Sequence, residues 1–274
     1  MSLIALAIVA TIVAAAISSV MASAWYLQQR TGNSGWVDVT WSLGVGGVAA
    51  IAAAWPIGEN WPLGENWPHW RQMVVAMLAA SWCLRLGLHI AGRTRAATDD
   101  PRYRNLIIQW GSDAPRRMFW FLQSQAAVGI MLALSIVVAA HNPNPDLRIQ
   151  DLIGVVILLA AIVGEAVADQ QLRTFKSAPA NRNSVCDTGL WRLSRHPNYF
   201  FEWLAWLSYP IIAIDFAGQN PFGWLAVAAP ICMYWVLVHV SGIPPLEEHM
   251  LRSRGEAFRA YQKRTRAFFP LPLK

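Results

Sequence analysis

Seven long apolar segments, separated by short polar stretches, dominate the chain. A helix needs about 20 mostly apolar residues to cross the hydrocarbon core of a bilayer, and each segment is near that length. The pattern therefore predicts an all-α protein, a multi-pass integral membrane bundle of seven transmembrane helices. The segments are Leu3–Tyr26, Trp36–Trp55, Met73–Ala91, Phe119–Ala140, Leu152–Ala168, Tyr199–Ala217 and Phe222–Val240.

The basic residues predict how these segments cross the membrane. All but three of the 22 Lys and Arg residues follow the first, third, fifth or seventh segment. Arg71 and Arg148 lie in the alternate loops, and Arg85 lies within the third segment. Basic loops stay in the cytoplasm, so we expect an external N-terminus and a cytoplasmic C-terminus. The first segment is too long for a cleaved signal peptide and lacks a basic start, which predicts that it is retained.

Composition agrees with a membrane protein. The 274 residues are 55% hydrophobic and only 14% charged, and 15 of them are Trp. Soluble domains carry about a quarter charged residues, which excludes an ordinary soluble enzyme. The net charge of +6 falls on one side of the bundle, so nucleic acid is not an expected partner. The three cysteines are scattered, and the length fits one membrane domain, 1–274.

Ionisable residues inside the apolar segments are candidates for function, because charge is costly in hydrocarbon. Each group also has a simpler explanation, namely capping by an acid, snorkelling of basic side chains, or ion pairing along one helix face. Five segments nevertheless place polar groups at similar depth, which predicts a shared polar cavity open to the cytoplasm. The groups are Asp38 and Trp41; Arg85, His89 and Arg93; Glu165, Asp169, Arg173 and Lys176; Asn198 and Glu202; and Glu247, Glu248 and His249.

The arginines around this predicted cavity favour a ligand that carries phosphate, since guanidinium groups bind phosphate in a bidentate manner. The chain has no Walker loop and no Rossmann glycine motif, so helix-borne side chains would have to hold a nucleotide. It also lacks nucleophile-elbow and paired Cys/His motifs, and no metal site is expected.

One run is the most informative motif of the chain. Residues 189–202 read Gly-Leu-Trp-Arg-Leu-Ser-Arg-His-Pro-Asn-Tyr-Phe-Phe-Glu, and residues 258–270 read Phe-Arg-Ala-Tyr-Gln-Lys-Arg-Thr-Arg-Ala-Phe-Phe-Pro. With the pair Glu247-Glu248, these motifs resemble the membrane steroid 5α-reductase family, in particular its bacterial branch described as a domain of unknown function. The resemblance runs from Trp36 to the C-terminus and implies a bacterial cytoplasmic membrane.

A second family shares part of this pattern. Membrane methyltransferases of the isoprenylcysteine and phospholipid type also carry Arg-His-Pro-x-Tyr, a later Glu-Glu and a basic tail, and they use S-adenosylmethionine. Asn198-Tyr199 followed by the acid Glu202 is similar to an element of the sterol reductases, which favours the reductase. The chain departs from the reductases at Lys176, where they have Arg, and at Phe201, where they have Gly. A transporter or receptor is the third alternative.

The resemblance implies an NADPH-dependent reduction of the C=C bond of a 3-oxo-Δ4-steroid or a similar apolar enone that enters from the surrounding lipid. It implies that Asp38, in protonated form, donates a hydrogen bond to the ketone oxygen, that His89 is the reserve donor, and that Trp41 forms an apolar wall. The residues implied for cofactor binding are Asp169, Arg173, Lys176, Arg195, His196, Asn198, Tyr199, Glu202, Glu248, Tyr261 and Arg264.

Overall fold

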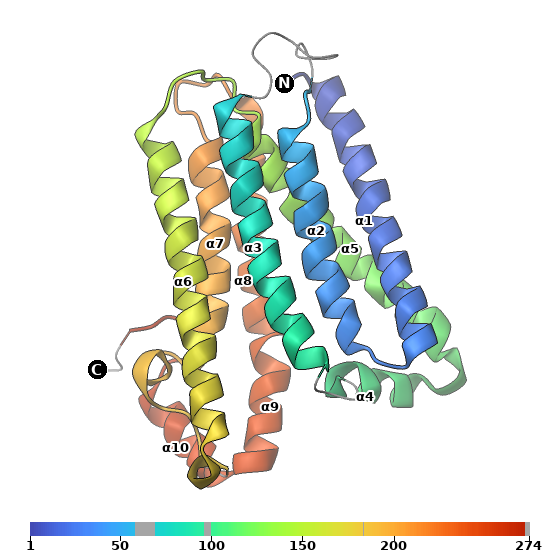
Figure 1. Ribbon diagram of the computed structural model, residues 1–274, viewed down its shortest axis with the longest axis vertical. Coiled ribbons are helices and arrows are strands. Elements are labelled where there is room, and N and C mark those ends of the chain that lie inside the picture. Colours follow the sequence, from blue (N-terminus) through green and yellow to red (C-terminus); the bar gives the residue numbers. More distant parts are fainter. Residues whose placement is uncertain (58–68, 96–99, 183, 272–274) are drawn as a thin grey trace. The chain divides into compact units, whose positions relative to one another are not determined.

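The computed structural model describes residues 1–57, 69–95, 100–182 and 184–271, and these are almost entirely helical (Figure 1). The pairing of Ser194 with Arg266 is an isolated bridge, and the described residues form no β-strand. The α-helices are α1 (Leu3–Thr31), α2 (Gly35–Ala54), α3 (Trp70–Arg95), α4 (Pro101–Trp110), α5 (Ala114–Ala140), α6 (Ile149–Ser177), α7 (Pro197–Ala213), α8 (Ala228–Trp235), α9 (Ile243–Arg254) and α10 (Glu256–Arg264).

Six helical stretches of the described chain are long and apolar enough to cross a membrane. They are α1, α2, α3, the stretch Arg102–Ala140 that includes α5, α6, and the stretch Pro221–Arg254. The multi-pass prediction is thus supported, whereas the count of seven is not confirmed. The predicted segment Tyr199–Ala217 corresponds to α7, which has 17 residues and contains Pro210.

The predicted segment Phe222–Val240 is helical but not one continuous α-helix. It begins as a 3₁₀-helix (Pro221–Val227), continues as α8 and ends in a π-helix (Val236–Val240) before α9 begins. Changes of helix type of this kind alter the direction of side chains along a span.

The chain divides into two compact units. Unit 1 comprises Met1–Asp151 and Tyr209–Ala229, and unit 2 comprises Leu152–Ser208 and Pro230–Lys274. In unit 1, α1, α2 and α3 run side by side, α5 packs against all three, and α4 lies across one end of α5 (Figure 1).

Glycines let the helices of unit 1 approach closely. A Cβ atom at Gly46 would lie 2.1 Å from Cβ of Cys83, and one at Gly129 would lie 2.6 Å from the Val45 side chain. Small residues at helix contacts are a common device in membrane bundles, where close packing replaces the hydrophobic effect as the source of association.

A buried ion-pair cluster closes one end of unit 1. Arg71 of α3 is 1% exposed, and its Nε and Nη2 donate to the Asp151 carboxylate at 3.1 and 3.0 Å. Arg148 donates to the same carboxylate at 2.9 Å. Arg71 also donates to the carbonyl oxygens of Asn142, Asn144 and Asp146, so the cluster holds the α5–α6 connection against α3.

In unit 2, α6 packs against α7 and the C-terminal tail folds back onto α7. Gly164 of α6 faces the Phe201 ring so closely that a Cβ atom would lie 2.3 Å from it. Phe268 and Phe269 of the tail make edge contacts with Trp203 of α7, at ring separations of 5.7 and 5.9 Å. Phe268 is therefore part of the core of this unit, whereas Phe269 covers it from the surface.

The Asp151 cluster yields a test of the fold. Asp151→Ala leaves Arg71 and Arg148 buried without an anion, and we expect it to lower the free energy of unfolding by about 3–5 kcal/mol. Asp113→Ala is the matched control, because Asp113 is 69% exposed and 3.9 Å from Arg117. Exposed pairs of that kind contribute about 0–1 kcal/mol. Unfolding of the purified protein in mixed micelles measures both changes, and equal small losses would contradict the proposed weight of the cluster.

Candidate functional site

The implied site residues fall into two groups, one in each unit. Asp38, Trp41 and His89 belong to unit 1, and all eleven residues implied for cofactor binding belong to unit 2.

Asp38 is the centre of a hydrogen-bonded group in unit 1. Its carboxylate accepts a hydrogen bond from the Tyr103 hydroxyl at 2.7 Å and forms a short ion pair with Arg102. Asp38 opens α2, whereas Arg102 and Tyr103 belong to α4, so the group ties these two helices together. The Asp38 carboxyl therefore already has two protein partners, one guanidinium and one phenol, in this arrangement.

Tyr103 is the buried member of this group, with 4% of its surface exposed. Its oxygen accepts a hydrogen bond from Nε2 of Gln125, at 3.2 Å, while its proton is directed to Asp38. The backbone oxygen of Gln125 in turn accepts from the Trp41 indole at 3.2 Å. No role for Tyr103 or Gln125 was predicted from the sequence, although Tyr103 lies two residues after the Asp100-Pro101 pair at the start of α4.

Local sequence explains why α4 presents Arg102 and Tyr103 to Asp38. Asp100 caps the helix by accepting a hydrogen bond from the Arg102 backbone N–H at 2.9 Å, and Pro101 occupies the first turn. Burial acts to raise the pKa of Asp100, but hydrogen bonds and charge from Arg102 outweigh it and hold that pKa below its ordinary value. The capping carboxylate therefore also orients the Arg102 guanidinium.

His89 lies on α3 and is half-buried. Trp41 of α2 packs edge-on against Trp82 of α3, with ring centroids 6.5 Å apart. In this group Tyr103 supplies a buried hydroxyl and Asp38 a carboxylate. Trp41 and Trp82 supply flat apolar surfaces.

In unit 2, buried polar side chains gather where α6 and α7 face each other. Asn198 donates to the Asp169 carboxylate at 3.4 Å, which brings together two of the implied cofactor residues. Glu202, one turn after Asn198, accepts a hydrogen bond from the Trp206 indole at 3.0 Å. Asp169 and Glu202 are each only 6% exposed, so the two helices enclose carboxylates together with an amide.

Arg195 and His196 form a second polar group with α9. Arg195 binds Glu247 in a bidentate manner, at 2.7 and 3.1 Å, and Nε2 of His196 lies 3.0 Å from the same carboxylate. Gln262 of α10 also donates to Glu247 at 2.7 Å. The inward acid of the Glu-Glu pair is therefore Glu247, whereas the implied Glu248 is 63% exposed and paired with Arg252.

The other ring nitrogen of His196 is unusual. His196 is 3% exposed, and its Nδ1 has no hydrogen-bond partner within the part of the chain that the structure describes. The imidazole stacks on Tyr199 at 5.5 Å with an interplanar angle of 10°. Burial lowers the pKa of His196, and the Glu247 carboxylate only partly offsets this. A neutral imidazole with an unsatisfied nitrogen is suited to a polar ligand group.

Tyr261 and Arg264 contact other protein groups that hold α10 in place. Tyr261 is 2% exposed, and its hydroxyl donates to the Trp191 carbonyl in a short hydrogen bond. Arg264 is paired with Asp187 and lies over the Tyr261 ring. These contacts dock α10 onto the 3₁₀ turn Gly189–Arg192.

Gly189 allows that turn to form. Its φ of +58° favours glycine, and a Cβ atom there would lie 2.6 Å from the Gln171 side chain. Gln171 accepts a hydrogen bond from the Leu190 backbone at 2.9 Å, which joins the turn to the end of α6.

Arg173 and Lys176 lie on the last turns of α6 and are exposed. Arg173 donates to the neutral amide of Gln170 at 2.7 Å, and the ion pairs of the described residues do not include it. Both side chains lie C-terminal to Asp169 on the same helix.

Comparisons with known proteins identify a family for the chain and no named activity. No solved structure matches the chain. A Schizosaccharomyces pombe (strain 972 / ATCC 24843) protein described as "Uncharacterized protein C594.04c" is 26% identical over 274 residues, which cover 90% of this chain and 75% of that protein. The family described as "Protein of unknown function (DUF1295)" matches residues 24–265, and the chain therefore belongs to this family.

Proposed function

We propose that the protein is a membrane reductase that uses NADPH to reduce the C=C bond of an apolar enone, with 3-oxo-Δ4-steroids as the model substrates. The observation that supports this proposal best is the buried Tyr103 hydroxyl, which Asp38 and Gln125 hold by hydrogen bonds. Few residues in an apolar bundle can donate to a ketone oxygen, and a buried phenol is one of them.

The chemistry assigns different roles to Tyr103 and Asp38. NADPH, when bound, would supply the hydride for the β-carbon. Negative charge would develop on the ketone oxygen, and a proton taken up from water at the α-carbon would complete the saturated ketone. In our proposal the Tyr103 hydroxyl turns from Asp38 to this oxygen and stabilises the charge. Asp38 stays paired with Arg102 and positions the phenol, and so the proposal moves the donor role from Asp38 to Tyr103.

The remaining candidates of unit 1 shape the substrate site in this proposal. Trp41, held by its hydrogen bond to the Gln125 backbone, presents a flat wall to fused rings. His89 remains the reserve donor. Dryness around these groups would strengthen each hydrogen bond to the reacting oxygen.

Unit 2 supplies the side chains that suit a dinucleotide. Asn198, Asp169 and Glu202 offer amide and carboxylate groups for the ribose hydroxyls and the carboxamide, and Nδ1 of His196 is an unsatisfied polar atom near them in sequence. Arg173 and Lys176 are assigned to the phosphates. Arg195 and Tyr261, whose polar atoms already have protein partners, position the segment 189–202 in this scheme.

The proposal includes an orientation. With the N-terminus outside and the C-terminal tail in the cytoplasm, Arg173, Lys176 and α10 lie on the side where NADPH is available. The distribution of Lys and Arg supports this orientation. The membrane proposed is the bacterial cytoplasmic membrane, and the single-domain prediction for 1–274 is kept.

Cofactor binding is the first test. We expect NADPH, and not S-adenosylmethionine, to bind detergent-purified protein in isothermal titration, and Glu202→Gln to weaken NADPH binding about tenfold or more through the loss of a charged hydrogen-bond acceptor. Glu256→Gln is the control, because its carboxylate is 91% exposed on α10. Binding of S-adenosylmethionine alone would contradict the reductase proposal and favour the methyltransferase. Equal effects of Glu202→Gln and Glu256→Gln would show that Glu202 does not contact the cofactor.

The role of Tyr103 gives a second test. Tyr103→Phe removes the proposed donor to the developing oxyanion, and we expect kcat for enone reduction to fall about 10²–10³-fold with NADPH affinity unchanged. Tyr26→Phe is the control, because that exposed hydroxyl only accepts a hydrogen bond from Arg30. If Tyr103→Phe retained full activity, the ketone-side donor would have to be another residue, with His89 the next candidate.

A further inference from the structure

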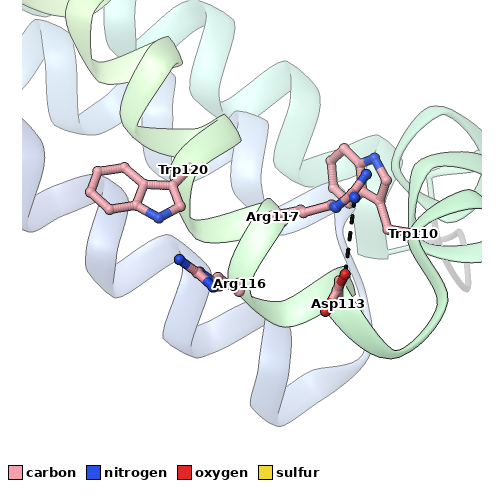
Figure 2. A pocket seen from close by; sticks show the side chains of 5 residues that line it. All are labelled: Trp110, Asp113, Arg116, Arg117 and Trp120. Carbon is pink, nitrogen blue, oxygen red and sulfur yellow. Dashed lines mark ion pairs between the residues drawn. The ribbon is translucent and has the colours of Figure 1, made fainter.

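A surface pocket in unit 1 has no residue in common with either group of site residues. It has a volume of about 470 Å³ and lies where α4 ends and α5 begins (Figure 2). Its lining consists of two arginines, two tryptophans and one acid, namely Arg116, Arg117, Trp110, Trp120 and Asp113.

The arginines give the pocket an excess of positive charge. Arg116 is exposed, and its guanidinium has no hydrogen-bond or ion-pair partner among the residues that the structure describes. The ion pair between Arg117 and Asp113 is long, at 3.9 Å, and both side chains are more than half exposed. Figure 2 shows Arg117 extending towards Trp110 and Arg116 lying on the Trp120 side. Two guanidinium groups therefore face a single, weakly paired carboxylate.

The first turn of α5 adds to this positive character. Asp113 precedes the helix, but its side chain caps none of the backbone N–H groups. Arg116 and Arg117 of this turn line the pocket, and the N-terminal turn of a helix is the end that favours anions.

The tryptophans point to the source of the anion. Trp120 is 63% exposed and lies on α5, where the apolar part of this candidate membrane-spanning stretch begins. Trp110 is half-buried and packs edge-on against Phe121 at 6.1 Å. Exposed Trp beside Arg, at the junction of polar and apolar sequence, is typical of the membrane–water interface.

We propose that this pocket binds the headgroup phosphate of an anionic phospholipid, with Arg116 and Arg117 on the phosphate oxygens and Trp120 against the glycerol and upper acyl chain. Basic pockets at the ends of membrane helices bind anionic headgroups by this combination of charge and amphipathic surface. The proposal stands independently of the reductase function, because it uses no residue assigned to substrate or cofactor.

Native mass spectrometry of the full chain in detergent, titrated with phosphatidylglycerol, tests the site. We expect one phosphatidylglycerol to bind more tightly than any further molecule. Arg116→Gln/Arg117→Gln should weaken this binding about thirtyfold, given the contribution of each basic residue near an anionic lipid. Asp113→Asn should strengthen it, because Arg117 then has no competing carboxylate.

Controls separate a built site from general charge. Arg259→Gln/Lys263→Gln removes two exposed basic residues of α10 and should leave the binding unchanged. Equal losses in both double variants would overturn the proposal in favour of diffuse attraction. Equal binding of phosphatidylcholine, or of glycerol 3-phosphate alone, would overturn the anionic-lipid assignment. Unfolding midpoints that are unchanged without lipid establish that the variants are folded. If Arg116→Gln/Arg117→Gln does not fold, the Asp113→Asn variant tests the proposal, and a failure to strengthen lipid binding would overturn it.

Discussion

A polar side chain within a membrane helix has to find its partner inside the protein, and this constraint organises the structure. Hydrocarbon cannot hydrogen-bond, so an unpaired charge there costs several kcal/mol. Arg71, which is 1% exposed, meets the constraint through Asp151, and two less buried arginines are paired in the same way, Arg102 with Asp38 and Arg195 with Glu247. Each joins segments that are distant in sequence, which explains how a chain with few charges fixes the contacts between its helices.

These three pairs differ in what they leave available. Arg71 donates five hydrogen bonds to a carboxylate and three carbonyls, and the cluster around it is structural. The Asp38 pair leaves a buried phenol at its edge, and the Glu247 group leaves one unsatisfied imidazole nitrogen. Groups that remain able to donate or accept in an apolar setting are where ligand chemistry is expected, and these two sites carry the proposed ketone and dinucleotide contacts.

Much of the fold could be predicted from apolar segment length, since the first five predicted segments coincide with α1, α2, α3, α5 and α6. Hydropathy could not predict the short α4, or that α7 ends at Ala213 after 17 residues. The site residues were harder to predict from the sequence. Adjacent glutamates project about 100° apart on a helix, so sequence alone could not choose Glu247 over Glu248. Likewise, the motif at residues 189–202 contains Arg195, but it does not show that the Arg195 guanidinium is already paired with Glu247.

Hydride transfer is the claim on which the functional account depends. The direct measurement is to incubate the purified protein, in lipid, with NADPH carrying deuterium at the reactive C4 position and with a 3-oxo-Δ4-steroid, and to locate the isotope in the product by mass spectrometry and NMR. The account predicts one deuterium at the former β-carbon of the enone. A methylated product formed only with S-adenosylmethionine, or an unchanged enone under conditions where NADPH is bound, would contradict it.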